Sequence, residues 1–154
     1  MDLSSILNPA AVKVVATVSS KKRLFQDLGD MAMECYGIDG SAAFSALQQR
    51  ESLGPTGVGR GVALPHARLA GLDRVVGCFL RVEKPFDFDA VDKQAVDLVF
   101  ALFAPEGSGV DHLKALALVS RTLRDSSICA KLRANGDAAT LHALLTDSLS
   151  NKAA

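Results

Sequence analysis

The sequence predicts one α/β domain of three layers (α/β/α), in which helices cover both faces of a mixed β-sheet. Apolar stretches of strand length alternate with segments whose apolar residues recur at helical spacing. One stretch, Ala95–Ala104, is almost wholly apolar, as expected for a central strand covered on both faces. The 154 residues, 49% of them hydrophobic, fit a single domain over 1–154, with about 148–154 as a disordered tail.

The N-terminal part predicts one strand followed by two helices. The β-branched residues of Val12–Thr17 indicate a strand. Ser19 is a candidate N-cap for a helix over Lys21–Tyr36, which Gly37 is expected to end. A second helix is expected over about 39–51, with its apolar residues again at helical spacing.

A glycine-rich segment follows, over residues 54–61. Four glycines in eight residues exclude a regular helix and indicate a loop or bulged strand whose backbone is accessible. Val62–Leu64 then extends the chain toward Pro65 and His66. Because the residue before a proline favours extended geometry, His66 is expected at the end of a strand.

The C-terminal half predicts two strands and three helices. The strands are Arg74–Val82 and Ala95–Ala104, joined by an irregular connection over 85–89. Ser108 and Asp111 match the Ser-x-x-Asp pattern with which a capped helix begins. The remaining expected helices are Ser127–Ala134 and Ala138–Ser148.

Composition narrows the class of protein. The chain has 17 basic and 17 acidic residues, so it lacks the basic excess typical of a nucleic-acid-binding protein. No stretch reaches the roughly 20 apolar residues of a membrane span, and the N-terminus does not resemble a secretory signal. The cysteines, expected as reduced core thiols, are Cys35, Cys78 and Cys129. We therefore expect a cytoplasmic protein that binds no nucleic acid and does not insert into a membrane.

Two common site motifs fail in detail. The glycine segment is not followed by the Gly-Lys-Ser/Thr of a P-loop, and Val62 stands where the third glycine of a dinucleotide fingerprint belongs. Asp87, Asp89 and Asp92 lack the glycine and glutamate of a calcium-binding EF-hand loop. We interpret these aspartates as turn and cap residues, and the sequence predicts no metal site.

Two of the three histidines occupy settings that favour an anion. His66 follows a proline directly behind the glycine-rich segment, and His112 falls in the first turn of a predicted helix. The unpaired N–H groups of a helix N-terminus attract anions and disfavour an imidazolium ion. His142, flanked by leucines in the last helix, is interpreted as a structural residue. Spacing alone does not show that His66 and His112 meet.

Three segments carry a family resemblance. Residues 57–66 read GVGRGVALPH, residues 50–56 read RESLGPT, and residues 112–116 read HLKAL. In this order and spacing they resemble the enzyme IIA proteins of the mannitol/fructose class, in the phosphoenolpyruvate-dependent phosphotransferase system. The nitrogen-regulatory enzyme IIA is the most similar branch. One departure is Ala67, where the family often has glycine after the phosphate-accepting histidine.

The resemblance implies a phosphotransferase that carries phosphate as phosphohistidine, with the enzyme IIA fold and no cofactor. It assigns His66 as the residue that accepts the phosphoryl group, at Nε2, from an HPr-like phosphocarrier protein. Arg50 and His112 would assist it as further catalytic residues. The glycine backbone would bind phosphate oxygens, at Gly57, Gly59 and Gly61.

The resemblance favours one biological role for the chain and leaves alternatives open. The chain carries no sugar-specific or membrane domain, which favours a regulatory component that acts on downstream target proteins. The alternatives are a sugar-specific enzyme IIA that passes phosphate to an enzyme IIB, and an interaction module that is not phosphorylated. A metal-dependent hydrolase is a weaker alternative, because no third ligand beside His66 and His112 is indicated.

Overall fold

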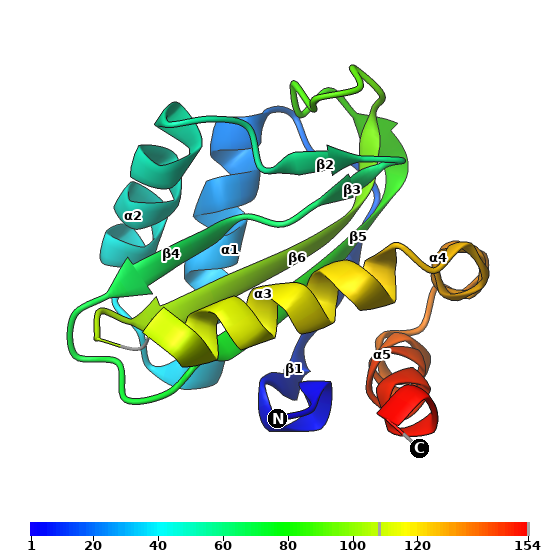
Figure 1. Cartoon of the computed structure of the whole chain (residues 1–154). Helices are drawn as coiled ribbons and strands as arrows, with labels where there is room; N and C mark the ends of the chain where they lie inside the picture. Colours follow the sequence, from blue (N-terminus) through cyan, green and yellow to red (C-terminus); the bar gives the residue numbers. More distant parts are fainter. Residues whose placement is uncertain (108, 154) are drawn as a thin grey trace.

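Within residues 1–107 and 109–153, which the computed structural model describes, six strands form one mixed β-sheet (Figure 1). The strands are β1 (Leu7–Val15), β2 (Gly57–Gly59), β3 (Val62–Ala63), β4 (His66–Leu69), β5 (Val76–Phe86) and β6 (Val96–Pro105). Their order across the sheet is β1-β5-β6-β3-β2, and β4 also pairs with β6.

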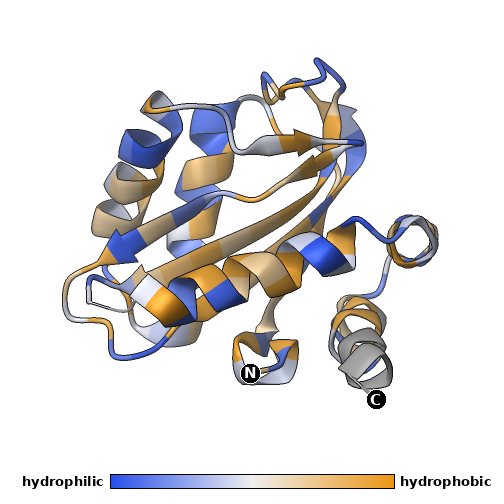
Figure 2. Ribbon diagram, in the orientation of Figure 1, coloured by the Kyte–Doolittle hydropathy of each residue, from blue (hydrophilic) through white to orange (hydrophobic). Residues whose placement is uncertain are grey.

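The strand β6 lies in the middle of this sheet. It runs antiparallel to β5 on one side and parallel to β3 and β4 on the other. Its side chains are hydrophobic and buried from Leu98 to Ala104 (Figure 2). Burial on both faces is what a near-continuous apolar strand requires, so the prediction of a central strand at Ala95–Ala104 is confirmed.

Helices cover both faces of the sheet, as the sequence predicted for a three-layer α/β/α domain (Figure 1). The helices α1 and α2 pack on one face, against β1, β5 and β4, while α3, α4 and α5 pack on the other. They are α1 (Lys21–Tyr36), α2 (Gly40–Ser52), α3 (Gly109–Leu123), α4 (Ser126–Ala134) and α5 (Ala138–Ala153), preceded by a short 3-10 helix, η1 (Leu3–Ser5).

The ends of α1 and α2 follow from specific caps. Ser20, rather than the predicted Ser19, caps α1, because its extended backbone lets Oγ accept the N–H of Arg23. Gly37 ends α1 in the left-handed conformation, as predicted. Asp39 caps α2 through its carboxylate. Ser108, the expected cap of α3, lies outside the described residues.

Two strands extend beyond their predicted bounds. The strand β1 covers Leu7–Val15 rather than Val12–Thr17, and it starts early because an edge strand tolerates the irregular register around Pro9. The strand β5 covers Val76–Phe86 instead of Arg74–Val82, since Phe86 still pairs with Val96 past a register shift. The start of the connection predicted over 85–89 is therefore strand.

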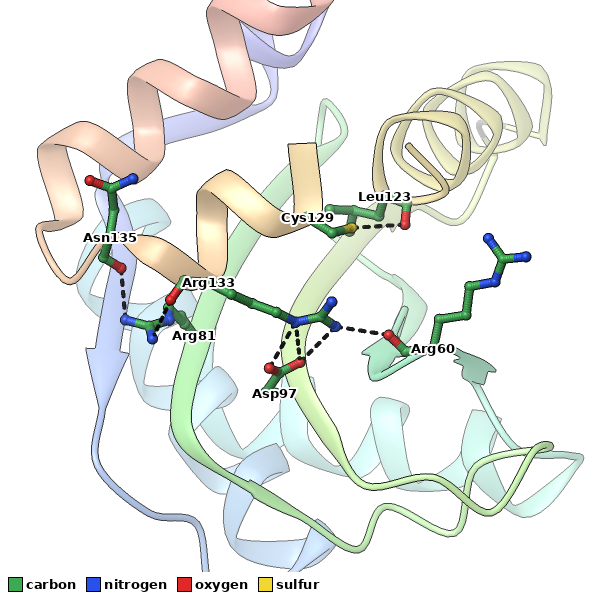
Figure 3. A network of polar contacts seen from close by, with 7 residues as sticks. All are labelled: Arg60, Arg81, Asp97, Leu123, Cys129, Arg133 and Asn135. Atoms are coloured by element: carbon green, nitrogen blue, oxygen red, sulfur yellow. Dashed lines mark hydrogen bonds and ion pairs between the residues drawn. The ribbon is translucent and has the colours of Figure 1, made fainter. Parts of the chain in front are cut away.

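The helix α4 is fastened to the sheet by two arginines (Figure 3). Arg133 Nε and Nη2 both donate to the carboxylate of Asp97 on β6, at 2.9–3.1 Å, and Nη2 also donates to the Arg60 carbonyl. Arg81 on β5 donates to the carbonyls of Arg133 and Asn135 at the C-terminus of α4. These bonds satisfy carbonyls that a helix end leaves unpaired.

The cysteines only partly match their prediction as core thiols. All three are free, and Cys78 and Cys129 are buried, but Cys35 on α1 is partly exposed. Cys35 lies in the last turn of α1, where its side chain packs against the core but stays partly open to solvent.

The C-terminal helix α5 runs to Ala153, beyond the predicted Ala138–Ser148. The tail expected over about 148–154 falls on residues whose side chains, and at 154 the backbone, lie outside the described part, so it stays a prediction. In that described part, no helix has both the length and the hydrophobicity to cross a bilayer.

Candidate functional site

A cleft of about 410 Å³ lies between α2, β4 and α3. His66 and Arg68 of β4, Arg50 of α2 and His112 of α3 line it together with Leu53, which follows α2. The structure thus brings His66, His112 and Arg50 into one place from three segments that are distant in the sequence. The glycines of the 54–61 segment do not line this cleft.

His66 is held by the pairing of its strand with β6. The chain from Val62 to Leu69 runs along β6 as two short strands, β3 and β4, that Leu64 and Pro65 separate. His66 pairs with Leu102 as the first residue of β4, so it does not end a strand as predicted. Proline interrupts the ladder because it has no N–H, but the Pro65 carbonyl accepts the N–H of Leu102 and pairing resumes.

The hydrogen bonds of the His66 ring fix its tautomer. Nδ1 lies 2.8 Å from the Leu64 carbonyl, which can only accept, so Nδ1 carries the proton. Nε2 therefore carries the ring lone pair, which accepts a bond of 3.3 Å from Arg50 Nε. The nitrogen that is able to act as a nucleophile therefore faces a guanidinium.

Arg50 is positioned by the last turn of α2 and the loop after it. Its Nη1 donates to the Gly54 carbonyl at 3.0 Å. The neighbouring Glu51 carboxylate accepts a hydrogen bond from the N–H of Thr56 and forms an ion pair of 2.9 Å with Lys21 of α1. These contacts hold the loop against both helices, so the guanidinium keeps its place beside His66.

His112 stands in the first turn of α3 and is 5% exposed. The centroid of its ring lies 5.5 Å from that of His66, with the ring planes at 68°. Its Nδ1 accepts a bond of 3.2 Å from Arg68 Nε. Its Nε2 is buried and has no hydrogen-bond partner within the described residues, a costly state for a polar atom.

Both imidazoles are held neutral near pH 7. Burial lowers the pKa of His66 below its ordinary value of 6.5, and the Arg50 guanidinium lowers it further, against the opposing effect of the Leu64 carbonyl. Burial, then the charges of His66 and Arg68, lowers the pKa of His112 to about 4. A neutral His66 keeps the Nε2 lone pair that nucleophilic attack needs.

The three glycines proposed as phosphate-binding lie on the β2–β3 hairpin and meet other parts of the fold. A Cβ on Gly57 would lie 2.7 Å from that of Ala90, and Gly59 lines a separate cleft of about 270 Å³. Gly61 has a φ of 79° and lies beside the Arg133–Asp97 pair, so close packing and a left-handed backbone require glycine there. The expected approach of this backbone to the His66 cleft is not seen.

Arg68 is the cleft residue that sequence reasoning missed. His66 and Arg68 are two residues apart on β4, and side chains at that spacing share one face of a strand. The period-two pattern could have found it. His66 was instead interpreted as the end of the strand, so the alternation was not followed past it.

The aspartates of the 87–92 turn behave as predicted. The carboxylate of Asp87 accepts the N–H of Asp89, and that of Asp92 accepts the N–H groups of Arg60 and Gln94. Among the described residues, no three His, Cys, Asp or Glu side chains gather in a group able to hold a metal ion.

Comparison with known proteins identifies the family. The model of the family described as phosphoenolpyruvate-dependent sugar phosphotransferase system, EIIA 2, matches residues 5–148. The chain belongs to this enzyme IIA family. The expected membership is confirmed, and with it the assignment of the domain to a component of the phosphotransferase system.

The relatives of this enzyme IIA domain include nitrogen regulatory proteins. A "Nitrogen regulatory protein" of Bradyrhizobium diazoefficiens is 47% identical over 145 residues, covering 94% of this chain and 95% of that protein. The crystal structure of nitrogen regulatory protein IIA-Ntr from Neisseria meningitidis is 36% identical with a TM-score of 0.85, covering 92% of this chain and 97% of that one. IIA mannitol from Escherichia coli, at 19% identity, a TM-score of 0.70 and coverage of 85% and 94%, shows the shared fold alone.

The lowered pKa of His112 predicts an acid-sensitive stability of this enzyme IIA domain. The unfolded chain takes up a proton on this residue near pH 6.5, whereas the folded chain resists until about pH 4. The free energy of unfolding should therefore fall on acidification across this range, by up to about 3 kcal/mol from this group. Urea unfolding at a series of pH values should show a shallower fall in His112→Gln than in the wild type. Parallel curves would contradict the prediction.

Proposed function

We propose that this enzyme IIA domain accepts a phosphoryl group on His66 Nε2 from the phosphohistidine of an HPr-like carrier protein. We propose further that it acts mainly as a regulatory, nitrogen-type component. The observation that carries the proposal is that one cleft holds both the Nε2 lone pair of His66 and two hydrogen-bond donors. These donors are Arg50 Nε and the unpaired Nε2 of His112.

The transfer itself is a displacement at phosphorus. The Nε2 lone pair of His66 forms the new N–P bond while the N–P bond of the donor breaks and its electron pair returns to the donor nitrogen. No proton has to leave Nε2, because Nδ1 holds the only ring proton and donates it to Leu64. Since donor and acceptor are both histidines, the step calls for no cofactor.

The surrounding groups supply positioning and charge. Phosphoryl transfer depends chiefly on in-line placement and on donors aimed at the equatorial oxygens. Arg50 offers a planar cation next to the acceptor nitrogen, and a guanidinium suits phosphoryl oxygens. His112 offers a buried N–H that a phosphoryl oxygen on His66 would satisfy. Burial strengthens both interactions.

The regulatory part of the proposal is supported by the names of the relatives. The similar proteins from Bradyrhizobium diazoefficiens and Neisseria meningitidis are nitrogen regulatory proteins. We infer that the partners of this chain are an HPr-like donor and downstream target proteins in the cytoplasm.

Intact mass spectrometry tests the proposal directly. The chain is incubated with phosphoenolpyruvate, enzyme I and an HPr-like protein, and each component is omitted in turn. We expect the mass of one phosphoryl group to be added, to be lost in acid, and to require every component. An unchanged mass would overturn the proposal in favour of an interaction module. Onward transfer to an added enzyme IIB would place the chain in sugar transport.

Removing either donor should slow phosphoryl uptake without unfolding the domain. Losing one electrostatic contact to a transferred group costs roughly a hundredfold in rate. We expect a loss of this order in Arg50→Met and in His112→Ala, measured as the initial rate of phosphorylation. Arg23→Met, which removes an exposed arginine of α1, is the matched control and should keep the wild-type rate. Circular dichroism should show all of these variants folded, and unchanged rates in the two site variants would exclude the assigned roles.

A further inference from the structure

Arg68 reaches the site from the edge of the sheet and contacts one residue there. It is the third residue of β4, on the same face as His66, and its side chain lines the cleft. The contact described for it is the bond of 3.2 Å from its Nε to His112 Nδ1. No bond from Arg68 to His66 is found among the described residues, so its effect on His66 would pass through His112.

We propose that Arg68 is a positioning residue that keeps the ring proton of His112 on Nε2, the nitrogen that serves the phosphoryl group. The inference rests on the proposed function, because that function gives the Nε2 proton its use. The bond between Arg68 and His112 does not depend on it. A guanidinium can only donate, so the His112 nitrogen that it contacts must be the one without a proton. A neutral imidazole has one N–H, which therefore lies on Nε2.

The two histidines of the cleft consequently hold opposite tautomers. His66 is protonated on Nδ1 by its bond to the Leu64 carbonyl, and His112 is protonated on Nε2 by its bond from Arg68. One ring then presents a lone pair and the other presents an N–H. Attack on phosphorus and donation to a phosphoryl oxygen need this division.

This tautomer of His112 needs Arg68, because it leaves the buried Nε2–H group of His112 unpaired. The Nε2 atom of His112 finds no partner among the described residues, although the ring is 5% exposed. A buried N–H without an acceptor favours any change that relieves it, such as a rotated ring or a proton moved to Nδ1. The bond from Arg68 opposes both changes, because a rotated ring would set its guanidinium N–H against a ring C–H, and a moved proton would set it against a ring N–H.

Heteronuclear NMR of the imidazole nitrogens tests the tautomers in the free protein. We expect His112 to show a bare Nδ1 and a protonated Nε2, and His66 the reverse. In Arg68→Met the His112 signals should no longer be those of the pure Nε2-protonated tautomer, while the His66 signals should be unchanged. The control Arg121→Met, an exposed arginine of α3, should change neither. A His112 ring that stays purely Nε2-protonated in Arg68→Met would overturn the proposal.

A double-mutant cycle tests the consequence for the rate. By analogy with partners that orient metal-binding histidines, we expect Arg68→Met to slow phosphoryl uptake roughly tenfold or more. If Arg68 acts through His112, adding Arg68→Met to His112→Ala should slow the reaction no further. Multiplied effects would show that Arg68 contacts the phosphoryl group itself, which contradicts a positioning role.

The two measurements separate failure of this inference from failure of the proposed function. If the wild type takes up no phosphoryl group, the function is wrong, and the tautomers of His112 in wild type and Arg68→Met still decide the role of Arg68. If uptake is normal and Arg68→Met matches Arg121→Met in rate and spectrum, the function stands and the role of Arg68 is refuted.

Discussion

The substitution His66→Ala is expected to remove all phosphoryl uptake, the largest effect predicted for this chain. His66 is half-buried and has its ring lone pair on Nε2 beside Arg50, whereas the lone pair of the buried His112 lies on Nδ1 beside Arg68. The loss should be complete rather than partial, because alanine offers no atom that can form the N–P bond.

The other histidines cannot replace it. His112 is buried, its Nδ1 is occupied by Arg68, and its Nε2 carries the proton. His142 lies on α5, where its Nε2 bonds to the Leu7 carbonyl at 2.9 Å, as its interpretation as a structural residue predicted. Neither ring therefore has a bare nitrogen that faces Arg50 in the cleft of His66.

Intact mass after incubation with the complete phosphorylating mixture measures this prediction. We expect His66→Ala to keep its unmodified mass at all times, and His142→Gln, the matched control, to be phosphorylated like the wild type. Thermal unfolding should show that His66→Ala is folded, since the side chain is only half-buried. Phosphoryl uptake by folded His66→Ala would exclude His66 as the acceptor.

The fold was predicted well where local pattern determines it. Helical periodicity located α1, with Gly37 at its end, and hydrophobic continuity located β6. The short strand β4 was not predicted, because its residues form a strand only by pairing with β6, far along the chain. The strand β2 lies in the segment 54–61, for which a loop and a bulged strand were both left open. His66 was interpreted as the end of a strand, because sequence alone does not show that β6 lies alongside and that pairing with it resumes after Pro65.

The site was predicted less evenly. His66 and His112 were singled out from their settings in the sequence, Arg50 through the family resemblance, and the structure brings all three into one cleft. The glycines of the segment 54–61 were weak evidence for a phosphate site, because a glycine needed for close packing against Ala90 looks the same in sequence as one needed to approach a phosphate. Arg68 was missed because its importance depends on where His112 lies, 44 positions away.

The largest loss of stability is expected where α1 and α2 cross. Gly29 of α1 and Gly40 of α2 are both buried, and a Cβ on Gly29 would lie 2.6 Å from the Gly40 carbonyl oxygen. That atom belongs to the backbone and cannot rotate away, so a larger residue must push the helices apart. Overpacking of this kind typically costs 1–3 kcal/mol, and we expect about 3 kcal/mol for Gly29→Val.

This displacement should also reach the site, because α2 carries Arg50 beside His66. The expected loss lowers the melting temperature by about 10 °C in a domain of this size. Phosphorylation measured well below that temperature should be slowed as well, since misplacing a group of an active site by about 1 Å can slow the reaction roughly a hundredfold. Gly107→Val is the matched control, because a Cβ at Gly107 meets no atom within 4 Å, and it should leave both measurements near wild type. If Gly29→Val has the same melting temperature as the control, α1 and α2 can separate at little cost in free energy. Close packing would then not explain the two glycines at their crossing.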